Sequence, residues 1–441
     1  MTLEHLKSRE QCAAVGERAY EFVRELFPIC RSITGDGVRR TLELIGARIP
    51  LERYEVPSGT AVFDWQVPQE WNIKDAYVKD SQGRRVIDFQ QSNLHVVSYS
   101  VPVRQTMSLA ELRPHLHSMP EHPDWIPYRT SYYRPSWGFC LRDRDLQSLR
   151  EDRYEVCIDS SLAAGSLSYA ECYLPGASSR EILISTHICH PSLANDNASG
   201  MAVATELAAA LAAAPRRLSY RFVFAPGTIG AITWLARNES GLGRVAHGLV
   251  LGLLGDPGPL TYKQSARGDA CVDRAAAHVL GSIGVASRIE SFSPYGYDER
   301  QFCSPGFNLP VGRLTRSAND AYPQYHSSAD DLTLVAAEYL AESLYAAAQL
   351  LEALDGDGTY LNTNPKCEPQ LGKRGLYRST GGKGPGQFEH ALMWVLNQSG
   401  GERSLLEIAE RSRLPFAVVR AAADALLGAG LLTENSEART T

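Results

Sequence analysis

The chain has 441 residues, of which 44% are apolar and 21% are charged, and its formal net charge is −6 with a pI near 6.0. This composition excludes a disordered, collagen-like or coiled-coil protein, and the length predicts two to four domains at about 150 residues each. A net negative chain has no overall basic field, so its bulk charge does not favour nucleic acid or an anionic membrane.

The first ten residues mix His5, Lys7 and Arg9 with acidic side chains, so we expect no signal peptide there. The most apolar stretches, such as 202–214, are too short to cross a bilayer. Nine cysteines without CxxC spacing argue against a disulfide framework. We therefore expect a soluble cytoplasmic protein with no membrane partner.

The first third of the chain contains two different sequence patterns, one helical and one rich in β-strands. Apolar residues recur at helical spacing from about 14 to 50, with a Thr-Gly-Asp-Gly turn at 34–37 between two predicted helices. From 61 to 149, short alternating runs rich in Trp, Tyr and β-branched residues are separated by Pro, Gly and Asp. This pattern predicts a small inserted β-rich domain.

After residue 150 the chain alternates between apolar strand-like runs and helices. The predicted strands are 182–186, 220–225, 249–254 and 308–314, and the predicted helices are 200–214, 229–237 and 334–354. Such alternation is typical of an α/β fold, here a mixed sheet flanked by helices. We assign residues 1–60 and 150–360 to this main domain.

The last part of the chain predicts a linker and a winged helix-turn-helix domain. Residues 361–385 are rich in Pro, Gly, Lys and Asn, and residues 386–441 contain three helical segments followed by a strand. Between His390 and Glu434 there are four arginines (403, 411, 413, 420) and five acids (402, 407, 410, 424, 434). Because a DNA-reading helix normally carries a basic surface, we expect this domain to contact protein, including a second copy of the chain, rather than nucleic acid.

The segment most informative about chemistry follows the predicted strand 182–186. His187 and His190 leave the carboxyl end of that strand, and Asp196 follows six residues later, before a helix. Open α/β sheets bind ligands at such strand ends, and imidazole and carboxylate groups are zinc ligands in hydrolases. The alternative is an ordinary turn, with two solvated histidines and an aspartate that caps the helix.

A second group of polar residues precedes the long predicted helix 334–354. Tyr325 and His326 are followed by Asp330 and Asp331, so this loop could supply a third imidazole ligand together with a carboxylate that orients it. The alternative is that one of these acids only caps the helix. Upstream, Asp298 and Glu299 form a polar pair in a Pro/Gly-rich loop, where a solvated role is the simpler reading.

Together these segments resemble the zinc aminopeptidases of the M28 type, whose metal-binding motifs match Asp196–Gly200, Asp298 and Tyr325–Asp330 in order. More closely, the whole chain resembles the DUF4910 family of aminopeptidase-like proteins through Thr-His-Ile-Cys-His-Pro-Ser-Leu-Ala-Asn-Asp-Asn at 186–197. The resemblance implies an M28-like fold with an inserted β domain, a C-terminal winged helix and a zinc site formed by His187, His190, Asp196 and His326.

The chain departs from the M28 pattern at Gly227. The resemblance implies glutamates in this stretch, one as general base and one as metal ligand, but residues 222–230 contain no carboxylate. We therefore expect one zinc ion rather than two, and a base supplied by Asp256, Asp298, Glu299 or Asp331, or help from the substrate's own carboxylate. The alternative is a site that binds without hydrolysing. If residue 227 is the vacated base position, Gly227→Glu is expected to raise activity.

Other polar residues are candidates for the metal site or for substrate binding. Asp256 follows the predicted strand 249–254, near the position of another M28 metal ligand. The candidate substrate-binding residues are Arg129 and Tyr132 in the inserted domain, Lys263 and Arg267 after that strand, and Tyr325. Cationic and hydroxyl groups of this kind suit a carboxylate or a phosphate, although a solvated surface explains them equally well.

These observations favour a zinc-dependent hydrolase that cleaves an amide bond in a small peptide-like or N-acylated substrate. The inserted domain would restrict access, which favours a specialised biosynthetic role. Two alternatives remain at this stage. The first is a catalytically silent relative that keeps the pocket as a metal or ligand site, and the second is a regulator that senses a ligand and binds DNA through the winged helix.

Overall fold

The computed structural model describes residues 6–376 and 386–435, and its main domain is built around an eight-stranded mixed sheet. In spatial order the strands are β1 (Glu52–Pro57), β10 (Ser166–Leu174), β12 (Ser219–Ala225), β11 (Glu181–His187), β13 (Val245–Leu251), β16 (Val311–Thr315), β14 (Leu260–Lys263) and β15 (Ser287–Glu290). The central strands β12, β11, β13 and β16 are parallel, whereas β10 and β14 run antiparallel to their inner neighbours. The predicted α/β class with a mixed sheet is confirmed.

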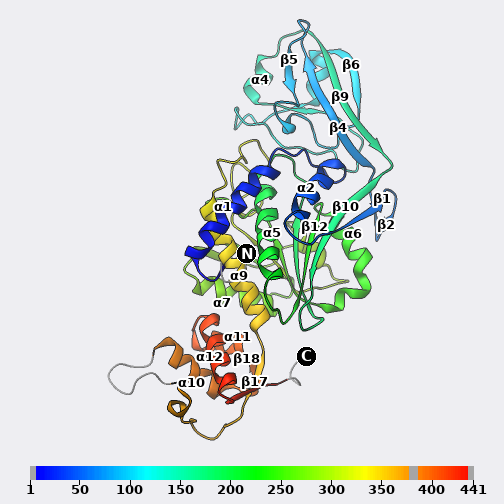
Figure 1. Cartoon of the computed structure of the whole chain (residues 1–441). Coiled ribbons are helices and arrows are strands. Elements are labelled where there is room, and N and C mark those ends of the chain that lie inside the picture. The colour runs from blue at the N-terminus through cyan, green and yellow to red at the C-terminus, as the bar shows by residue number, and fades with distance from the viewer. Residues whose placement is uncertain (1–5, 377–385, 436–441) are drawn as a thin grey trace.

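Helices cover both faces of this sheet (Figure 1). One face packs against α1 (Arg9–Leu26), α2 (Asp36–Gly46), α5 (Gly200–Ala212), α7 (Cys271–Ser282) and α9 (Ala337–Gly356), and the other against α6 (Ile229–Asn238) and α8 (Glu299–Phe302). Alternate residues of β11 enter the two cores: Ile182 and Ile184 face α5, and Leu183 faces α6. A strand buried on both faces explains why the 182–186 run is continuously apolar.

A second, four-stranded antiparallel sheet forms most of the inserted region, at one end of the main domain (Figure 1). Its strands are β5 (Arg85–Asp88), β4 (Glu70–Lys79), β9 (Arg153–Ala163) and β6 (Val103–Ser108), in that order. Smaller elements complete the region: β2 (Ala61–Val62), β3 (Trp65–Gln66), β7 (Leu116–His117), β8 (Phe139–Cys140), α3 (Leu109–Leu112) and α4 (Asp143–Ser148). The inserted region has a separate apolar core, which includes Val78, Phe139 and Val156.

The C-terminal module lies at the opposite end of the main domain (Figure 1). It contains α10 (Gln387–Gln398), α11 (Leu405–Ser412) and α12 (Phe416–Gly428), with a sheet of β18 (Gly400–Ser404), β17 (Thr359–Asn362) and β19 (Leu432–Glu434). Strand β17 thus overlaps the start of the expected linker 361–385. The rest of that linker between 377 and 385, and the end of the chain at 436–441, lie outside the described residues.

Within the described ranges, no helix combines the length and the apolar character needed to cross a membrane. The carboxyl ends of the central parallel strands instead converge on the loop 188–199, which leads from β11 into α5. This edge of the sheet carries the polar cluster described next.

Candidate metal centre

His187 and Asp196 are held together by an irregular helical turn, Ala194–Ser199, that precedes α5. The Asn197 amide donates to the His187 carbonyl at 2.9 Å and to the Thr186 hydroxyl at 2.8 Å. Neither Asn197 nor Ser199 caps α5 through its side chain, in contrast to the usual role of such residues. The turn is therefore fastened to the end of the strand, which places Asp196 over His187.

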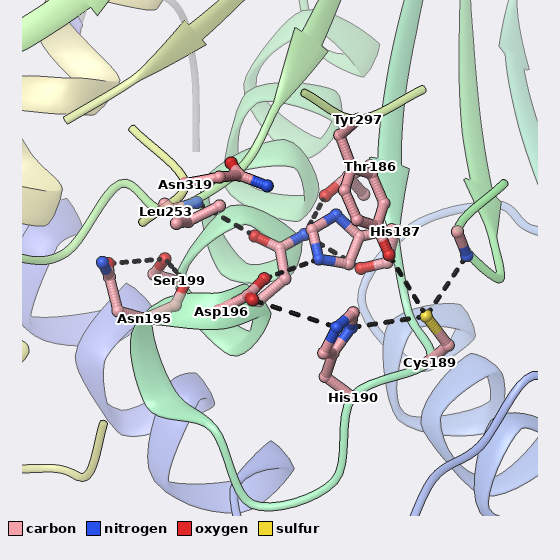
Figure 2. Close-up of polar contacts among 12 residues, drawn as sticks. Thr186, His187, Cys189, His190, Asn195, Asp196, Ser199, Leu253, Tyr297 and Asn319 are labelled. Carbon is pink, nitrogen blue, oxygen red and sulfur yellow. Dashed lines mark hydrogen bonds and ion pairs between the residues drawn. The ribbon is translucent and has the colours of Figure 1, made fainter. Parts of the chain in front are cut away.

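Three imidazoles surround the Asp196 carboxylate, and Figure 2 shows two of them, those of His187 and His190. Asp196 Oδ1 lies 2.8 Å from His187 Nε2, and Asp196 Oδ2 lies 3.2 Å from His326 Nε2 and 3.9 Å from His190 Nε2. Zinc–ligand bonds of about 2.0–2.1 Å in a tetrahedron place neighbouring ligand atoms about 3.3 Å apart. The observed spacings bracket that value.

Several polar atoms of this cluster are buried without a hydrogen-bond partner: His187 Nδ1, Asp196 Oδ2 and His326 Nε2. Buried polar groups are normally satisfied, and two of these atoms, Asp196 Oδ2 and His326 Nε2, lie 3.2 Å apart, as two ligands of one ion would. His187, His190 and Asp196 each offer a ligand atom, and these atoms lie within 4.8 Å of one another. The residues present therefore fit a zinc ion.

The protonation states also suit a metal. Burial lowers the pKa of His187, and it lowers the pKa of His190 to about 3. Burial alone would raise the pKa of the Asp196 carboxyl, but the facing imidazoles hold it well below its usual range. Neutral imidazoles and an ionised carboxylate are the forms that bind a cation.

A residue of the inserted region, Tyr128, forms one wall of the cluster. Its ring centroid lies 5.1 Å from those of both His190 and His326, and its backbone N–H donates to the His326 carbonyl at 2.7 Å. Tyr132, which was predicted to bind substrate, contacts Tyr128, and the two hydroxyl oxygens lie 3.0 Å apart. Arg129, in contrast, is exposed, and its backbone carbonyl accepts from the Ser98 N–H at 2.8 Å.

Of the two adjacent acids after His326, Asp330 rather than Asp331 supports the cluster. Asp330 is fully buried and accepts hydrogen bonds from the Asn195 N–H at 2.6 Å and the Asp196 N–H at 3.0 Å. Asp331 accepts from the N–H and hydroxyl of Thr333. The expectation of a catalytic Asp331 is corrected, because its carboxylate closes a local turn.

Asp256 also has a role other than the expected one. Its carboxylate accepts from the Asn195 amide at 2.9 Å, from the Gly258 N–H at 2.7 Å and from the Ser317 hydroxyl at 2.6 Å. Both oxygens are therefore engaged, and Asp256 is not part of the metal-ligand cluster. Its buried carboxylate instead joins the 195 turn to the loop after β16.

Glu299 and Lys263, expected as a base and a substrate ligand, form a buried ion pair. Glu299 Oε1 lies 2.5 Å from Lys263 Nζ, and the same carboxylate accepts from the Tyr297 N–H at 3.1 Å. Lys263 Nζ also donates to the Ser293 carbonyl at 3.1 Å. These contacts fix the loop before α8, so both residues hold Tyr297 in place instead of facing a substrate.

Tyr297 covers the position at which a general-base glutamate was expected. Its ring centroid lies 3.9 Å from that of His187, and its hydroxyl lies 3.5 Å from Cys189 Sγ (Figure 2). A Cβ built on Gly227 would overlap the Tyr297 hydroxyl and ring. Cys189 Sγ in turn accepts from the Gly227 N–H at 3.2 Å and lies 3.3 Å from His190 Nδ1.

Three further residues were predicted to belong to the site, and Tyr325 is the one that contacts a residue of the cluster. Asp298 is buried behind Tyr297 and accepts from the Thr228 N–H at 2.7 Å, and burial raises its pKa to about 7. The Tyr325 ring stacks on His326 at 3.9 Å. Arg267 is exposed and donates to the Asn308 carbonyl, a structural contact away from the cluster.

Comparisons with known proteins agree with this architecture. The family model described as a domain of unknown function, DUF4910, matches residues 20–357, and a winged helix-turn-helix model matches residues 358–434. The chain therefore belongs to the DUF4910 family, as the resemblance of residues 186–197 predicted.

Similar proteins carry related descriptions. A Clostridium acetobutylicum protein, named for polysaccharide biosynthesis and an aminopeptidase-like domain, is 51% identical over 96% of this chain and 98% of its own. A crystal structure described as that of a peptidase from the same species is 50% identical, with a TM-score of 0.93 over 98% of this chain and 99% of that one. A zinc aminopeptidase from Bacillus subtilis shares the fold, with a TM-score of 0.57 and 12% identity over 77% of this chain and 95% of its own.

Proposed function

We propose that this protein is a zinc-dependent hydrolase that cleaves an amide bond in a small peptide-like or N-acylated substrate. The observation that carries the proposal is the convergence of His187, His190 and His326 on Asp196, with buried ligand atoms that have no other partner. When bound, zinc supplies Lewis acidity and lowers the pKa of a coordinated water toward about 7.

The residues of the chain divide the remaining work between binding and positioning. The three imidazoles and Asp196 would hold one ion, with water as a fifth ligand, because residues 222–230 offer no further carboxylate for a second ion. Asp330 orients the backbone of Asp196, and Tyr128 packs against His190 and His326. A closed, partly dry site strengthens electrostatic interactions with a bound substrate.

We assign the general base to Asp298. Of the four carboxylates considered for this role, Glu299 is in an ion pair, and Asp256 and Asp331 each accept at least two hydrogen bonds, whereas Asp298 accepts one at Oδ1, from the Thr228 N–H. Burial raises the pKa of Asp298 to about 7, close to the value at which a carboxylate is effective as a base near neutral pH. Asp298 directly follows Tyr297, whose ring packs on His187.

One observation favours a second candidate function, a silent relative that binds without hydrolysis. The space over Gly227 is filled by the Tyr297 phenol, which is a far weaker base than a carboxylate at neutral pH. In this case the cluster would hold a metal and a ligand but would not turn the ligand over.

Amine release by the zinc-loaded protein separates these candidates. We expect hydrolysis of at least one member of a panel of aminoacyl and N-acyl amides between about pH 6 and 9, and its loss in Asp196→Asn. Asp331→Asn is the control, since that carboxylate follows His326 closely in the chain but accepts only from the N–H and hydroxyl of Thr333. Bound zinc without turnover across the panel would support the silent relative.

For the winged helix we propose a protein-contact role. Arg420, the only basic residue of α12, donates to the Gly356 carbonyl and the Tyr360 hydroxyl, each at 2.9 Å, and pairs with Asp424. Phe416 and Val419 of the same helix are buried in the main core. Salt-dependent retardation of labelled DNA by the full chain would contradict the proposal, whereas concentration-dependent self-association without DNA binding would support it.

The specialised biosynthetic role remains a proposal that rests on the restricted access described above. The relative named for polysaccharide biosynthesis is consistent with it. We also propose a cytoplasmic location. The sequence pattern favours reduced cysteines, and all nine are free thiols in the structure.

A further inference from the structure

An arginine near the metal cluster is buried, and none of the described carboxylates lies within ion-pair distance of it. Arg313, on β16, is 3% exposed, and its Nη2 donates to the Asn319 side-chain oxygen. Its Nε has no hydrogen-bond partner. Among the described residues, no carboxylate lies within 4.0 Å of its guanidinium group, in contrast to Arg316, which pairs with Glu342. A buried charge is costly unless a counter-charge is present, so this arginine requires an explanation.

The strand register places a second buried cation next to Arg313. Arg313 on β16 lies directly opposite Lys263 on the antiparallel strand β14, and Lys263 is also buried, at 7% exposure. Like charges directly opposite each other destabilise a sheet. Among the described residues, Glu299 is the one carboxylate within 4.0 Å of either cation, and it contacts Lys263. Against the effect of burial, Arg313 and Lys263 both act to lower the pKa of Glu299, and burial raises the pKa of the neighbouring Asp298 to about 7. While Asp298 is protonated, this group of side chains therefore carries one positive charge in excess.

The excess charge lies on the same face of the sheet as the metal cluster. Arg313 pairs with Val250 on β13, which pairs with Ser185 on β11. Because strand side chains alternate, His187 points to the same face as Ser185. A second connection runs through Asn319, which donates to the Tyr325 hydroxyl at 3.2 Å, and the Tyr325 ring stacks on His326.

We infer that Arg313 binds a carboxylate of the substrate next to the metal cluster. The inference rests on the proposed function and specifies its substrate class: a peptide-like or N-acylated molecule with a free carboxylate. A guanidinium group offers a planar pair of donors that matches a carboxylate. One excess positive charge also suits a singly charged anion, and the unpartnered Nε supplies a donor for it.

The test compares N-acetylglycine with N-acetylglycinamide, which differ only in the carboxylate. Binding to the full-length protein is measured by calorimetry at constant ionic strength, both without metal and with zinc. The metal-free measurement matters because zinc itself attracts carboxylates. We expect the acid to bind about tenfold or more tightly than the amide in both states, since hydrogen bonds to charged groups are worth that much.

Three variants make the test specific. Arg313→Gln is expected to abolish the preference for the acid, and Arg313→Lys to retain part of it, because lysine keeps the charge but loses the paired donors. Arg267→Gln, which removes an exposed arginine, is expected to keep the full preference. Circular dichroism and zinc content of each variant show that the fold and the cluster are intact, and Arg313→Lys remains informative if Arg313→Gln does not fold.

The outcomes separate this inference from the proposed function. Equal affinity for acid and amide in the unmodified protein, no binding of the acid, or a preference that survives Arg313→Gln would overturn the carboxylate site. Hydrolysis of substrates without any preference for a carboxylate would overturn this inference alone. A preserved preference in a protein that binds zinc but never hydrolyses an amide would support the carboxylate site and count against the hydrolase.

Discussion

The Tyr297 side chain occupies the space in which a side chain at residue 227 would lie, since a Cβ built on Gly227 overlaps the phenol. The glycine is therefore matched to the tyrosine and is not simply a vacated base position. This packing argues against the expectation that Gly227→Glu raises activity, because a glutamate could enter only if Tyr297 moved off His187.

The first prediction tests that pairing. Gly227→Ala is expected to cost about 1–3 kcal/mol of unfolding free energy, as other overpacked cores do. In the Tyr297→Ala background the same change should cost much less, which a double-mutant cycle in urea would measure. Gly243→Ala is the control, since nothing lies within 4 Å of its Cβ position. Equal costs of Gly227→Ala in both backgrounds would show that the two residues are independent.

Neighbouring aspartates give a second, matched comparison. Asp330→Asn places an amide N–H₂ against the N–H groups of Asn195 and Asp196, and should weaken zinc binding about 10- to 100-fold, as loss of a group that orients a ligand does. Asp331→Asn should leave zinc affinity unchanged, because that carboxylate contacts only the turn at Thr333. Competition with a chelator would measure both affinities, and equal effects would refute the assignment.

The buried ion pair gives a third prediction. Glu299→Gln leaves Lys263 and Arg313 as two opposed cations, so it should cost about 3–5 kcal/mol of unfolding free energy. Removal of one cation in Glu299→Gln/Arg313→Gln should recover at least about 1 kcal/mol of that loss. Chemical denaturation of the two variants checks the difference. Additive costs would mean that the two cations do not repel each other.

The raised pKa of Asp298 gives a fourth prediction, on pH. Burial raises this pKa to about 7 from an ordinary value of 3.8, so between these values the folded state holds a proton that the unfolded state has lost. The contribution of the Asp298 carboxyl to the free energy of unfolding is therefore largest below about pH 4. It falls as the pH rises, and it is lost above about pH 7. Asp298→Asn should therefore gain a few kcal/mol relative to the unmodified protein between about pH 4 and 8. Parallel stability profiles would contradict the shift.

Much of the fold could be predicted because burial imposes a pattern on the chain. The continuous apolar run at 182–186 and the Ala-rich helix after it correspond closely to β11 and α5. Most of the ligand cluster could also be predicted from the sequence, because His187, His190 and Asp196 are close together in the chain and follow a predicted strand. His326 could be proposed as a third imidazole from its loop and from the resemblance, but its place against Asp196 could not, because that depends on contacts with the inserted region, at Tyr128.

Other parts of the site depend on long-range packing that no local pattern encodes. Tyr297 lay within the polar run that predicted Asp298 and Glu299, but its contact with Gly227 brings together residues seventy positions apart. Arg313 lies within an apolar strand, and a charged residue in such a strand was the only sign in the sequence of a role for it. Asp256 was misplaced because a carboxylate after a strand end can point either to the ion or to a supporting loop, and its hydrogen bonds decide which.

The most direct test of the account is anomalous diffraction from crystals of the full-length protein grown with zinc. We predict one zinc ion within about 2.0–2.2 Å of Asp196 and of imidazole nitrogens from His187, His190 and His326. Zinc bound without His187 and Asp196, or no zinc at this cluster when zinc is in excess, would contradict the central claim.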